Sequence, residues 1–398
     1  MTKKYTFACI ISLILSLSAC NVQTDKAPAS DLSAPLDSLF TELFPSPDEP
    51  GAVVLVAKGD SIIFNRSYGM ANMKRNIPLT DSTLLNICSI SKQFSAVALL
   101  KLQEEGLISL DDSVTKYFPK FPGRIFNKIT LRHLLSHTSG IPDARPRTRD
   151  QWNDYVRKHD TKFGNERDFA LYGLSREETR YMETLDWLDF KPGTAYKYQN
   201  PTFVLAQHII EQATGKAFLD YMDSTIFIPA GMTTTQYLNP DIQQPQLAHA
   251  YKLVDGPNRY GYWRSDDDKW EECDYGEALF FPTKADGGLY TSALEFLKYE
   301  KALFGGKIIS NYSLLQATTP VIATDEPLTS YGLGLFIEER PDRPRKIYHT
   351  GDNGGFLCVE AYFPEKDIFY LIFANQPHWD REATIEKTDS ILAAKKLI

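Results

Sequence analysis

Runs of apolar residues place β-strands near both ends of the chain. Residues 51–68 hold two such runs around a glycine-containing turn at 58–60, which predicts a β-hairpin. Toward the C-terminus, similar runs predict strands at 331–339, 345–350, 356–363 and 368–375. A turn at 364–367 joins the last two of these strands, and a final helix is predicted over 381–397.

The middle of the chain shows helical spacing instead. Apolar residues recur at helical intervals after Phe94 and again over 204–210, and 129–142 reads as a capped helix that ends at a glycine turn. We therefore predict an α+β fold, in which an antiparallel sheet flanked by helices is built from both chain ends and a mostly helical domain is inserted. The predicted divisions are a signal peptide at 1–20, a tether at 21–35, a sheet-containing domain at 36–115 plus 285–398, and a helical domain at 116–284.

The first twenty residues have the pattern of an export signal. Lys3 and Lys4 precede an apolar stretch at 7–17 that is too short to span a bilayer. The run at 17–20 resembles a bacterial lipoprotein box, which implies cleavage before Cys20 and lipid attachment to its thiol. The alternative is an ordinary signal peptide with a chance cysteine. We expect an exported lipoprotein that a lipid holds at a membrane, facing the periplasm or the cell exterior.

Composition narrows the class of protein. The chain is 43% hydrophobic and 12% aromatic with a formal charge of −8, which is typical of an acidic globular protein. No basic stripe is present, so nucleic acid is not an expected partner. Beyond Cys20, the cysteines at 88, 273 and 358 show no regular spacing, so we expect neither a disulfide framework nor a thiolate metal site.

The stretch 86–94 places a hydroxyl and an amine one helical turn apart, at Ser89 and Lys92. Ser89 falls near the amino end of the predicted helix, where unpaired backbone N–H groups and the helix dipole favour negative charge. A serine hydroxyl becomes a nucleophile when a nearby base takes its proton, so Ser89 is a candidate nucleophile and Lys92 its partner. The alternative is a helix cap and a solvated lysine. A second copy of the pattern, Ser113 and Lys116, falls in a turn.

Two further stretches carry candidate chemistry. Tyr198 and Asn200 put a phenol and an amide on an irregular turn, where they can accept a proton and hold a substrate carbonyl or amide. The same triplet recurs at Tyr237 and Asn239, so it is not specific alone. The glycine-rich run 348–356 ends one predicted strand and opens the next, where small residues let a substrate approach the backbone.

Other patterns favour structural roles. His133 and His137 have a spacing that zinc sites use, but there is no glutamate between them and no evident third ligand, so we expect structural hydrogen bonds there. The acidic run 266–268 lacks the glycine and glutamate of a calcium loop and is interpreted as a solvated loop. The aromatic segments 144–190 and 255–281 either flank a site and choose its substrate or decorate the surface.

Three motifs in order resemble those of the serine beta-lactamase-like family, which includes class C beta-lactamases, DD-peptidases, D-aminopeptidases and related esterases. They are Ser89 with Lys92, Tyr198 with Asn200, and His349-Thr350-Gly351. Segments 131–142, 191–194, 225–232 and 286–292 also look like family signatures, and together these stretches cover roughly residues 50–375. The resemblance implies a beta-lactamase/transpeptidase-like fold and a serine hydrolase that needs no cofactor or metal.

The resemblance also implies a role for each position. Ser89 would attack a carbonyl while Lys92 and Tyr198 share the work of the base, and Asn200 would orient the substrate. The backbone N–H groups of Ser89 and Asp352 would hold the oxyanion. The substrate-binding strand would be formed by His349, Thr350, Gly351 and Asp352.

One departure bears on the substrate. Class C beta-lactamases usually carry a lysine where this chain has His349, and histidine, with an ordinary pKa of about 6.5, is largely neutral at pH 7. We therefore expect an esterase or D-peptidase that is a weak beta-lactamase at most, acting on a small-molecule or peptide acyl donor. The alternatives are an acyltransferase that passes the acyl group to an alcohol or amine, and a penicillin-binding or wall-binding lipoprotein without catalysis. The oligomeric state is not predicted.

Overall fold

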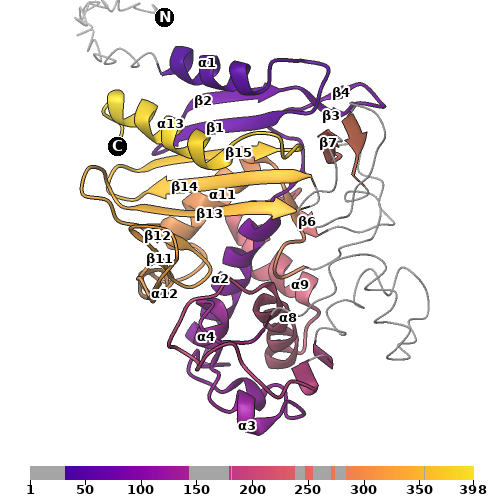
Figure 1. Cartoon of the computed structure of the whole chain (residues 1–398), viewed down its shortest axis with the longest axis vertical. Coiled ribbons are helices and arrows are strands. Elements are labelled where there is room, and N and C mark those ends of the chain that lie inside the picture. The colour runs from indigo at the N-terminus through magenta and orange to yellow at the C-terminus, as the bar shows by residue number, and fades with distance from the viewer. Residues whose placement is uncertain are drawn as a thin grey trace, which may run out of the picture. The chain divides into compact units, whose positions relative to one another are not determined.

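The main element of the fold is an antiparallel sheet, which has eight strands within the part of the chain that the structure describes, in the order β10-β11-β12-β13-β14-β15-β1-β2 (Figure 1). The structure is a computed structural model that describes residues 32–142, 179–180, 182–237, 247–253, 270–273, 284–353 and 355–398. The strand bounds are β1 (Ala52–Lys58), β2 (Ser61–Tyr68), β10 (Ile322–Ala323), β11 (Thr329–Tyr331), β12 (Phe336–Glu338), β13 (Lys346–Asn353), β14 (Phe356–Phe363) and β15 (Ile368–Ala374).

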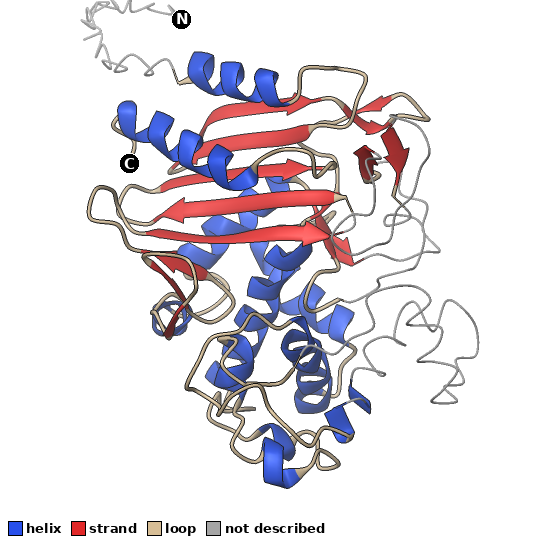
Figure 2. Ribbon diagram, in the orientation of Figure 1, coloured by secondary structure: helices blue, strands red, loops and turns tan. Residues whose placement is uncertain are grey.

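Both faces of this sheet are covered by helices, as Figure 2 shows. Helices α1 (Ser33–Leu43) and α13 (Arg381–Ala394) pack with Val54 and Val56 on one face. Helices α2 (Ser91–Glu104) and α11 (Ala293–Phe304) pack on the other face, with Val53 and Leu55. Because successive strand residues point to opposite faces, a strand buried on both sides must be apolar throughout, as β1 is.

Helix α2 lies at the centre of the hydrophobic core on the face of the sheet that α2 and α11 cover. All of its residues from Ser91 to Leu100 are buried, including polar ones, so only its last turn reaches solvent. Phe94 stacks on Tyr299 of α11 with ring centroids 3.9 Å apart. The one-turn 3-10 helix η1 (Cys88–Ile90) precedes α2 directly and belongs to the same core.

The remaining described elements lie between and beside these layers. The helices are η2 (Val114–Lys116), α3 (Gly123–Phe126), α4 (Leu131–Leu135), α8 (Asn200–Thr214), α9 (Phe218–Met222), the π-helical turn η4 (Asp223–Phe227), α10 (Ile228–Ala230) and α12 (Asn311–Ala317). The short strands are β3 (Met70–Asn72), β4 (Ile77–Pro78), β5 (Leu85–Asn86), β6 (Gln236–Tyr237), β7 (Tyr251–Leu253), β8 (Trp270–Glu272) and β9 (Leu289–Thr291).

Strand β13 approaches the turn before α2 very closely. A Cβ atom placed on Gly351 would lie 2.3 Å from the carbonyl oxygen of Ile87 and 2.9 Å from the Cβ of Cys88. Real Cβ atoms do not come so near to a backbone oxygen, so only glycine fits at this position. The C-terminal strands are thereby held against the segment that carries Ser89.

The predicted fold class is confirmed: strands from both chain ends pair in one antiparallel sheet, with β1 hydrogen-bonded to β15. The hairpin at 51–68, the strands at 356–363 and 368–375, and the last helix were predicted close to their observed bounds. Strand β13 starts as predicted near residue 345 but continues to Asn353. Within the described residues, no helix combines the length and apolar character that crossing a membrane would need.

Two predicted elements were wrong in extent. The strand expected at 331–339 is two strands, because Gly332 donates a hydrogen bond to the carbonyl of Leu335 and closes a tight turn between them. The helix expected at 129–142 is only α4, because His137 and Gly140 adopt left-handed φ angles of 57° and 74° that no helix can contain.

Helix α1 was not predicted, and it begins within the last residues assigned above to the tether. The division into a sheet-containing domain and a helical domain at 116 and 284 stays a prediction.

We expect Gly351→Ala to destabilise the fold by about 1–3 kcal/mol, because its new methyl group has no room beside Ile87. The matched control is Gly287→Ala, whose methyl group would meet the backbone of Cys88 at an ordinary 3.9 Å. Thermal and urea unfolding measure the difference. Equal stability of the two variants would contradict the close approach of β13 to this turn.

Candidate active site

Ser89 lies at an exposed point of an otherwise buried segment. From Thr83 to Leu100 it is the one residue that is not fully buried. Cys88, with a left-handed φ of 54°, turns the chain just before it. Two hydrogen bonds hold this turn: the Cys88 N–H donates to Asn86 Oδ1 at 2.8 Å, and Ser91 Oγ donates to the Cys88 carbonyl at 2.6 Å. The local structure thus presents one hydroxyl toward solvent on a rigid base.

Lys92 lies directly beneath that hydroxyl. Its side chain is fully buried, and Nζ donates to Ser89 Oγ at 3.0 Å and to the carbonyl of Asp286 at 2.6 Å. The amine also lies 5.1 Å from the ring centre of Tyr198 and 5.8 Å from that of Phe203. A buried amine needs hydrogen-bond acceptors and favours aromatic faces, and both are supplied here.

Tyr198 is positioned by the segment before α8. The N–H of the next residue, Gln199, donates to Nδ1 of His137 at 3.0 Å, and the Tyr198 ring lies against the His137 ring with centroids 4.2 Å apart. Phe336 of β12 stacks on the other side, with centroids 6.4 Å apart and planes nearly parallel. These contacts fix the phenol beside Lys92.

Asn200 is the first residue of α8, two residues after Tyr198. Its Oδ1 atom is buried and accepts no hydrogen bond from any residue that the structure describes. Buried amide oxygens are normally paired, so an unsatisfied one beside Tyr198 is suited to accept a hydrogen bond from a bound substrate.

His349 of β13 is 1% exposed and bonded on both sides of its ring. Nδ1 lies 2.6 Å from the carbonyl oxygen of Thr350, and Nε2 lies 3.1 Å from the hydroxyl of Tyr331. Because a carbonyl can only accept, Nδ1 carries a proton. A neutral ring then accepts at Nε2 from Tyr331, whereas a charged ring would donate to that hydroxyl, so the surroundings of the ring decide its charge.

The electrostatics agree with a neutral ring. Burial, and then the positive charge of Lys92, lower the pKa of His349 to about 3. The same two causes hold the pKa of His137 well below its ordinary value. Both histidines stay uncharged at neutral pH, so neither adds a second cation beside Lys92.

The segment after His349 lies next to Ser89 because of the close approach described above. Gly351 contacts the backbone of Ile87 and Cys88, and Asp352 follows it on the same strand. The two N–H groups proposed to hold an oxyanion, those of Ser89 and Asp352, thus belong to two segments in direct contact. Contacts thus link Ser89, Lys92, Tyr198 and His349, and the other described site residues lie within two positions of one of these or of Gly351.

The second copies of the motifs differ from the first. Ser113 caps the short helix η2, and Lys116 is exposed and forms an ion pair with Asp112 at 2.7 Å. Tyr237 packs in the core against Phe218, with ring centroids 5.2 Å apart, and Asn239 lies outside the described residues. The motif copies at the candidate site therefore differ from the repeated copies in their burial and in their neighbouring residues, and not in their spacing.

The two histidines considered for a metal have local partners. His133 Nδ1 accepts from the N–H of Thr130 at 3.1 Å and completes a capping box, and His137 supports Gln199 as above. Among the described residues, no three His, Cys, Asp or Glu side chains are grouped to hold a metal ion. The side chains of Cys88, Cys273 and Cys358 are buried.

Several contributors were not predicted from the sequence. The carbonyl of Asp286 holds Lys92, and Tyr331 holds His349. A backbone carbonyl leaves no residue-specific signal, and Tyr331 belongs to no motif; segment 286–292 stood out only through its likeness to a family signature. His137 was expected to make structural hydrogen bonds, and it accepts one from Gln199, next to Tyr198.

Some predicted features lie outside the described residues. They are Cys20 with its signal and tether, the acidic run 266–268, and most of the aromatic segments 144–190 and 255–281.

Comparison with known proteins supports the resemblance. A family model described as beta-lactamase matches residues 36–395. The chain is 28% identical over 342 residues to Penicillin-binding protein 4* of Bacillus subtilis (strain 168), covering 85% of this chain and 71% of that protein. It is 29% identical over 348 residues to a D-aminopeptidase of Cereibacter sphaeroides, covering 87% of this chain but only 60% of that enzyme.

Solved structures agree on the fold. The octameric penicillin-binding protein homologue from Pyrococcus abyssi superposes with a TM-score of 0.73 at 25% identity, covering 91% of this chain and 77% of that one. A D-amino acid amidase from Ochrobactrum anthropi SV3 has a TM-score of 0.71 at 22% identity, covering 92% and 99%, and shows the same fold. With a family model that matches nearly the whole described chain, this protein belongs to the beta-lactamase family of serine hydrolases.

Proposed function

We propose that the protein hydrolyses an ester or amide through an acyl-enzyme on Ser89, and that its acyl donor is a small ester or a D-amino acid amide or peptide. The observation that carries the proposal is the 3.0 Å hydrogen bond between Lys92 Nζ and Ser89 Oγ, formed by a fully buried amine at the one exposed point of its segment. An amine held in this way can take the hydroxyl proton as the nucleophile attacks.

The acylation step uses groups already in place. Ser89 Oγ attacks the carbonyl carbon, and its proton passes to Lys92, which acts as a base only in its neutral amine form, with Tyr198 beside it to share the transfer. The tetrahedral oxyanion is held by the N–H groups of Ser89 and Asp352. The carbon–oxygen or carbon–nitrogen bond then breaks, the leaving group takes the proton, and the acyl group stays on Ser89.

Deacylation reverses the roles. Water attacks the acyl carbon and gives a proton to Lys92 or Tyr198, the bond to Ser89 Oγ breaks, and that proton returns to Oγ as the acid product leaves. Asn200, with its buried and unsatisfied Oδ1, would accept a hydrogen bond from an N–H group of the acyl donor. An amide or peptide donor supplies such a group.

The substrate class rests on relatives and on His349. D-aminopeptidases are among the relatives, although the chain covers only 60% of their length. A neutral His349 supplies no permanent charge for the carboxylate of a beta-lactam. Acyl transfer to an alcohol or amine remains a second candidate, because one structure of the same fold is described as a hydrolase with promiscuous acyltransferase activity.

We also propose that the enzyme is an exported lipoprotein attached through Cys20, so that it works at a membrane surface outside the cytoplasm. The support is the sequence pattern at 1–20 alone.

Ser89→Ala should lower kcat for a p-nitrophenyl ester by at least about a thousandfold, because the nucleophile is lost, and Lys92→Met by about a hundredfold or more. The matched controls are Ser113→Ala and Lys116→Met, the same changes in the second copy of the motif. These controls should keep wild-type kcat within about threefold, since exposed ion pairs contribute little. Product analysis with added alcohol separates hydrolysis from acyl transfer.

Full activity of Ser89→Ala would exclude the mechanism. If the wild type hydrolyses none of a panel of esters, D-amino acid amides and D-peptides, the non-catalytic, penicillin-binding alternative would replace it.

Nitrocefin should be a poor substrate, with kcat/KM below about 10⁴ M⁻¹ s⁻¹, the low end for enzymes on their own substrates. The reason is the missing positive charge at position 349. Steady-state absorbance assays on nitrocefin and on D-amino acid p-nitroanilides make the comparison. Nitrocefin turnover well above this value, and above that of the anilides, would contradict the proposed substrate class.

The imidazole of His349 should stay neutral, with its proton on Nδ1, from pH 8 down to pH 5. The pKa of His349 in the folded protein is about 3, which lies below that range, so its imidazole takes up no second proton between pH 8 and pH 5. In the unfolded chain the ordinary pKa of about 6.5 applies, so this residue stabilises the fold above pH 6.5 and less as the pH falls toward 3. Nitrogen-15 NMR of the histidine-labelled protein measures the pKa of His349 and shows which ring nitrogen carries the proton, and the His349→Gln variant assigns the signal.

A midpoint for His349 between pH 5 and 8, or a proton on Nε2, would show that the Tyr331 and Thr350 contacts do not set its state.

A further inference from the structure

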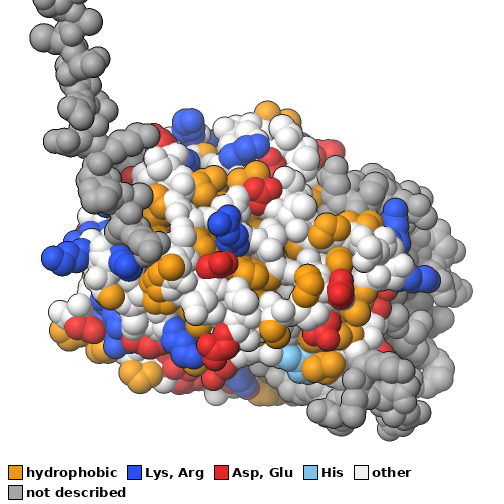
Figure 3. All heavy atoms as spheres, turned by 90° about the horizontal axis from the view of Figure 1, so that it is seen from above, with side chains coloured by type: hydrophobic (Ala, Val, Ile, Leu, Met, Phe, Trp, Pro, Cys, Tyr) orange, Lys and Arg blue, Asp and Glu red, His pale blue; other side chains and the backbone are white. Residues whose placement is uncertain are grey.

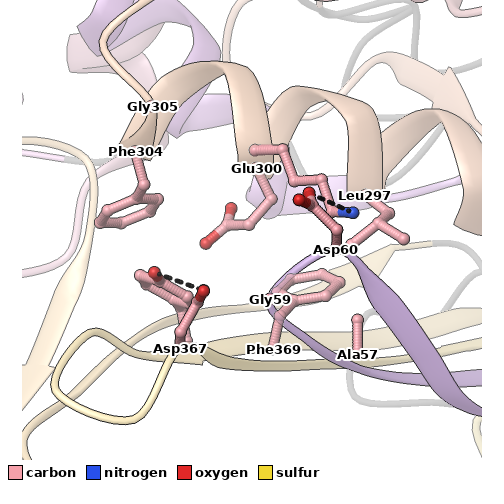
Figure 4. Close-up of a pocket in the computed structure, with 11 residues that line it drawn as sticks. Ala57, Gly59, Asp60, Leu297, Glu300, Phe304, Gly305, Asp367 and Phe369 are labelled. Atoms are coloured by element: carbon pink, nitrogen blue, oxygen red, sulfur yellow. Dashed lines mark hydrogen bonds and ion pairs between the residues drawn. The ribbon is translucent and has the colours of Figure 1, made fainter. Parts of the chain in front are cut away.

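A cavity lies at the strand ends beside α11, away from the active site, and none of the residues assigned to the active site lines it (Figure 4). Its volume is about 250 Å³. Helix α11, the turn between β1 and β2, strand β14 and the start of β15 enclose it, and its lining residues include Asp60, Glu300, Phe304, Tyr362, Asp367 and Phe369. Since sites for drug-sized ligands occupy about 300–1,000 Å³, this one suits a small molecule.

Glu300 points its carboxyl group into this space, as Figure 4 shows. The side chain is 3% exposed, and its Oε1 atom has no hydrogen-bond partner among the residues that the structure describes. A buried carboxyl oxygen without a partner is costly and uncommon. Its position at the wall of a cavity indicates that the partner is a molecule that enters the cavity.

Among the described residues, no cation forms an ion pair with Glu300. The next residue on α11, Lys301, turns to Asp60, with Nζ 3.3 Å from Oδ1. The acid that faces Glu300 from β14, Glu360, already has partners: Gln93 Nε2 donates to it at 3.0 Å, and the backbone N–H of His349 donates as well. Burial and the neighbouring carboxyl raise the pKa of Glu300 well above its ordinary value. Glu300 therefore holds a proton while the cavity contains no counter-charge.

The rest of the lining favours a positive charge with an apolar part. Asp60 and Asp367 bring two more carboxylates to the rim against one ammonium, that of Lys301, so an anion is disfavoured. Phe304 and Tyr362 form an aromatic wall, with ring centroids 4.3 Å apart, and Phe369 forms another. Aromatic faces attract organic cations, and within the described chain no cluster of three or more His, Cys, Asp or Glu side chains is placed to hold a metal ion.

We propose that this cavity binds a small alkylammonium ion, with its charged nitrogen on Glu300 and its alkyl part against Phe304 and Phe369. The proposal is independent of the hydrolase activity.

Binding couples to one proton. The protonated acid of Glu300 and the ammonium ion form a carboxylate–ammonium pair, and the acid proton leaves to solvent. Affinity should rise by up to about tenfold per pH unit while Glu300 is protonated in the free protein. The titratable and charged groups that face Glu300 are Asp60, Tyr299, Lys301, Glu360, Tyr362 and Asp367.

Calorimetric titration of the full chain with n-butylammonium chloride tests the proposal. The expected dissociation constant is on the order of a millimolar at pH 7.5. Repeating it in two buffers of different ionisation enthalpy should show release of close to one proton. Butan-1-ol and butyrate, which match the probe in size without its charge, should bind at least about tenfold more weakly.

Two variants localise the site. Glu300→Gln should weaken n-butylammonium binding about tenfold or more and abolish proton release, because an amide cannot ionise. Phe304→Leu, which keeps an apolar wall without the ring, should weaken it about threefold. The matched control is Glu365→Gln, which removes the same charge from the exposed turn beside the cavity without lining it and should change affinity less than about twofold.

Absence of binding to the wild type, equal binding of butan-1-ol, or unchanged binding in Glu300→Gln would each overturn the proposal. If Glu300→Gln does not fold, the wild-type proton release and the Phe304→Leu result decide.

Discussion

The site depends on one contact, the hydrogen bond of 3.0 Å from the buried amine of Lys92 to the partly exposed Ser89 Oγ. An amine removed from water must find other partners, and the surrounding fold supplies them. The carbonyl of Asp286 accepts at 2.6 Å, and the rings of Tyr198 and Phe203 lie within 6 Å. Segments from three distant parts of the chain thus meet at one side chain, and the fold is largely the arrangement that allows this.

The same burial determines the charge of the two neighbouring histidines. A second positive charge beside Lys92 would be repelled, and both His137 and His349 are held neutral by desolvation and by that amine. They act instead through hydrogen bonds of fixed direction, His137 toward Gln199 and His349 between Thr350 and Tyr331. The site therefore holds at most one cation, Lys92, among neutral polar groups, so it offers no fixed positive charge at His349 for the carboxylate of a substrate.

Much of this could be predicted from the sequence. Apolar runs at both chain ends indicated the sheet, because strands buried on two faces must be apolar, and Ser89, Lys92, Tyr198 and His349 stood out through their motifs. Tertiary features could not be predicted. The left-handed residue His137 ended a predicted helix, and the turn at Gly332 divided a predicted strand. The carbonyl of Asp286 and the hydroxyl of Tyr331 act through positions that only the folded chain defines.

The central claim is that Ser89 carries the acyl group. Intact-mass measurement after rapid quenching, followed by peptide mapping, tests it most directly, with a slowly released ester as the donor. The account predicts one acyl group per chain on the peptide that contains Ser89, and none on the Ser89→Ala protein. An adduct on another residue, Ser113 included, or hydrolysis that continues with no adduct in the Ser89→Ala protein, would contradict it.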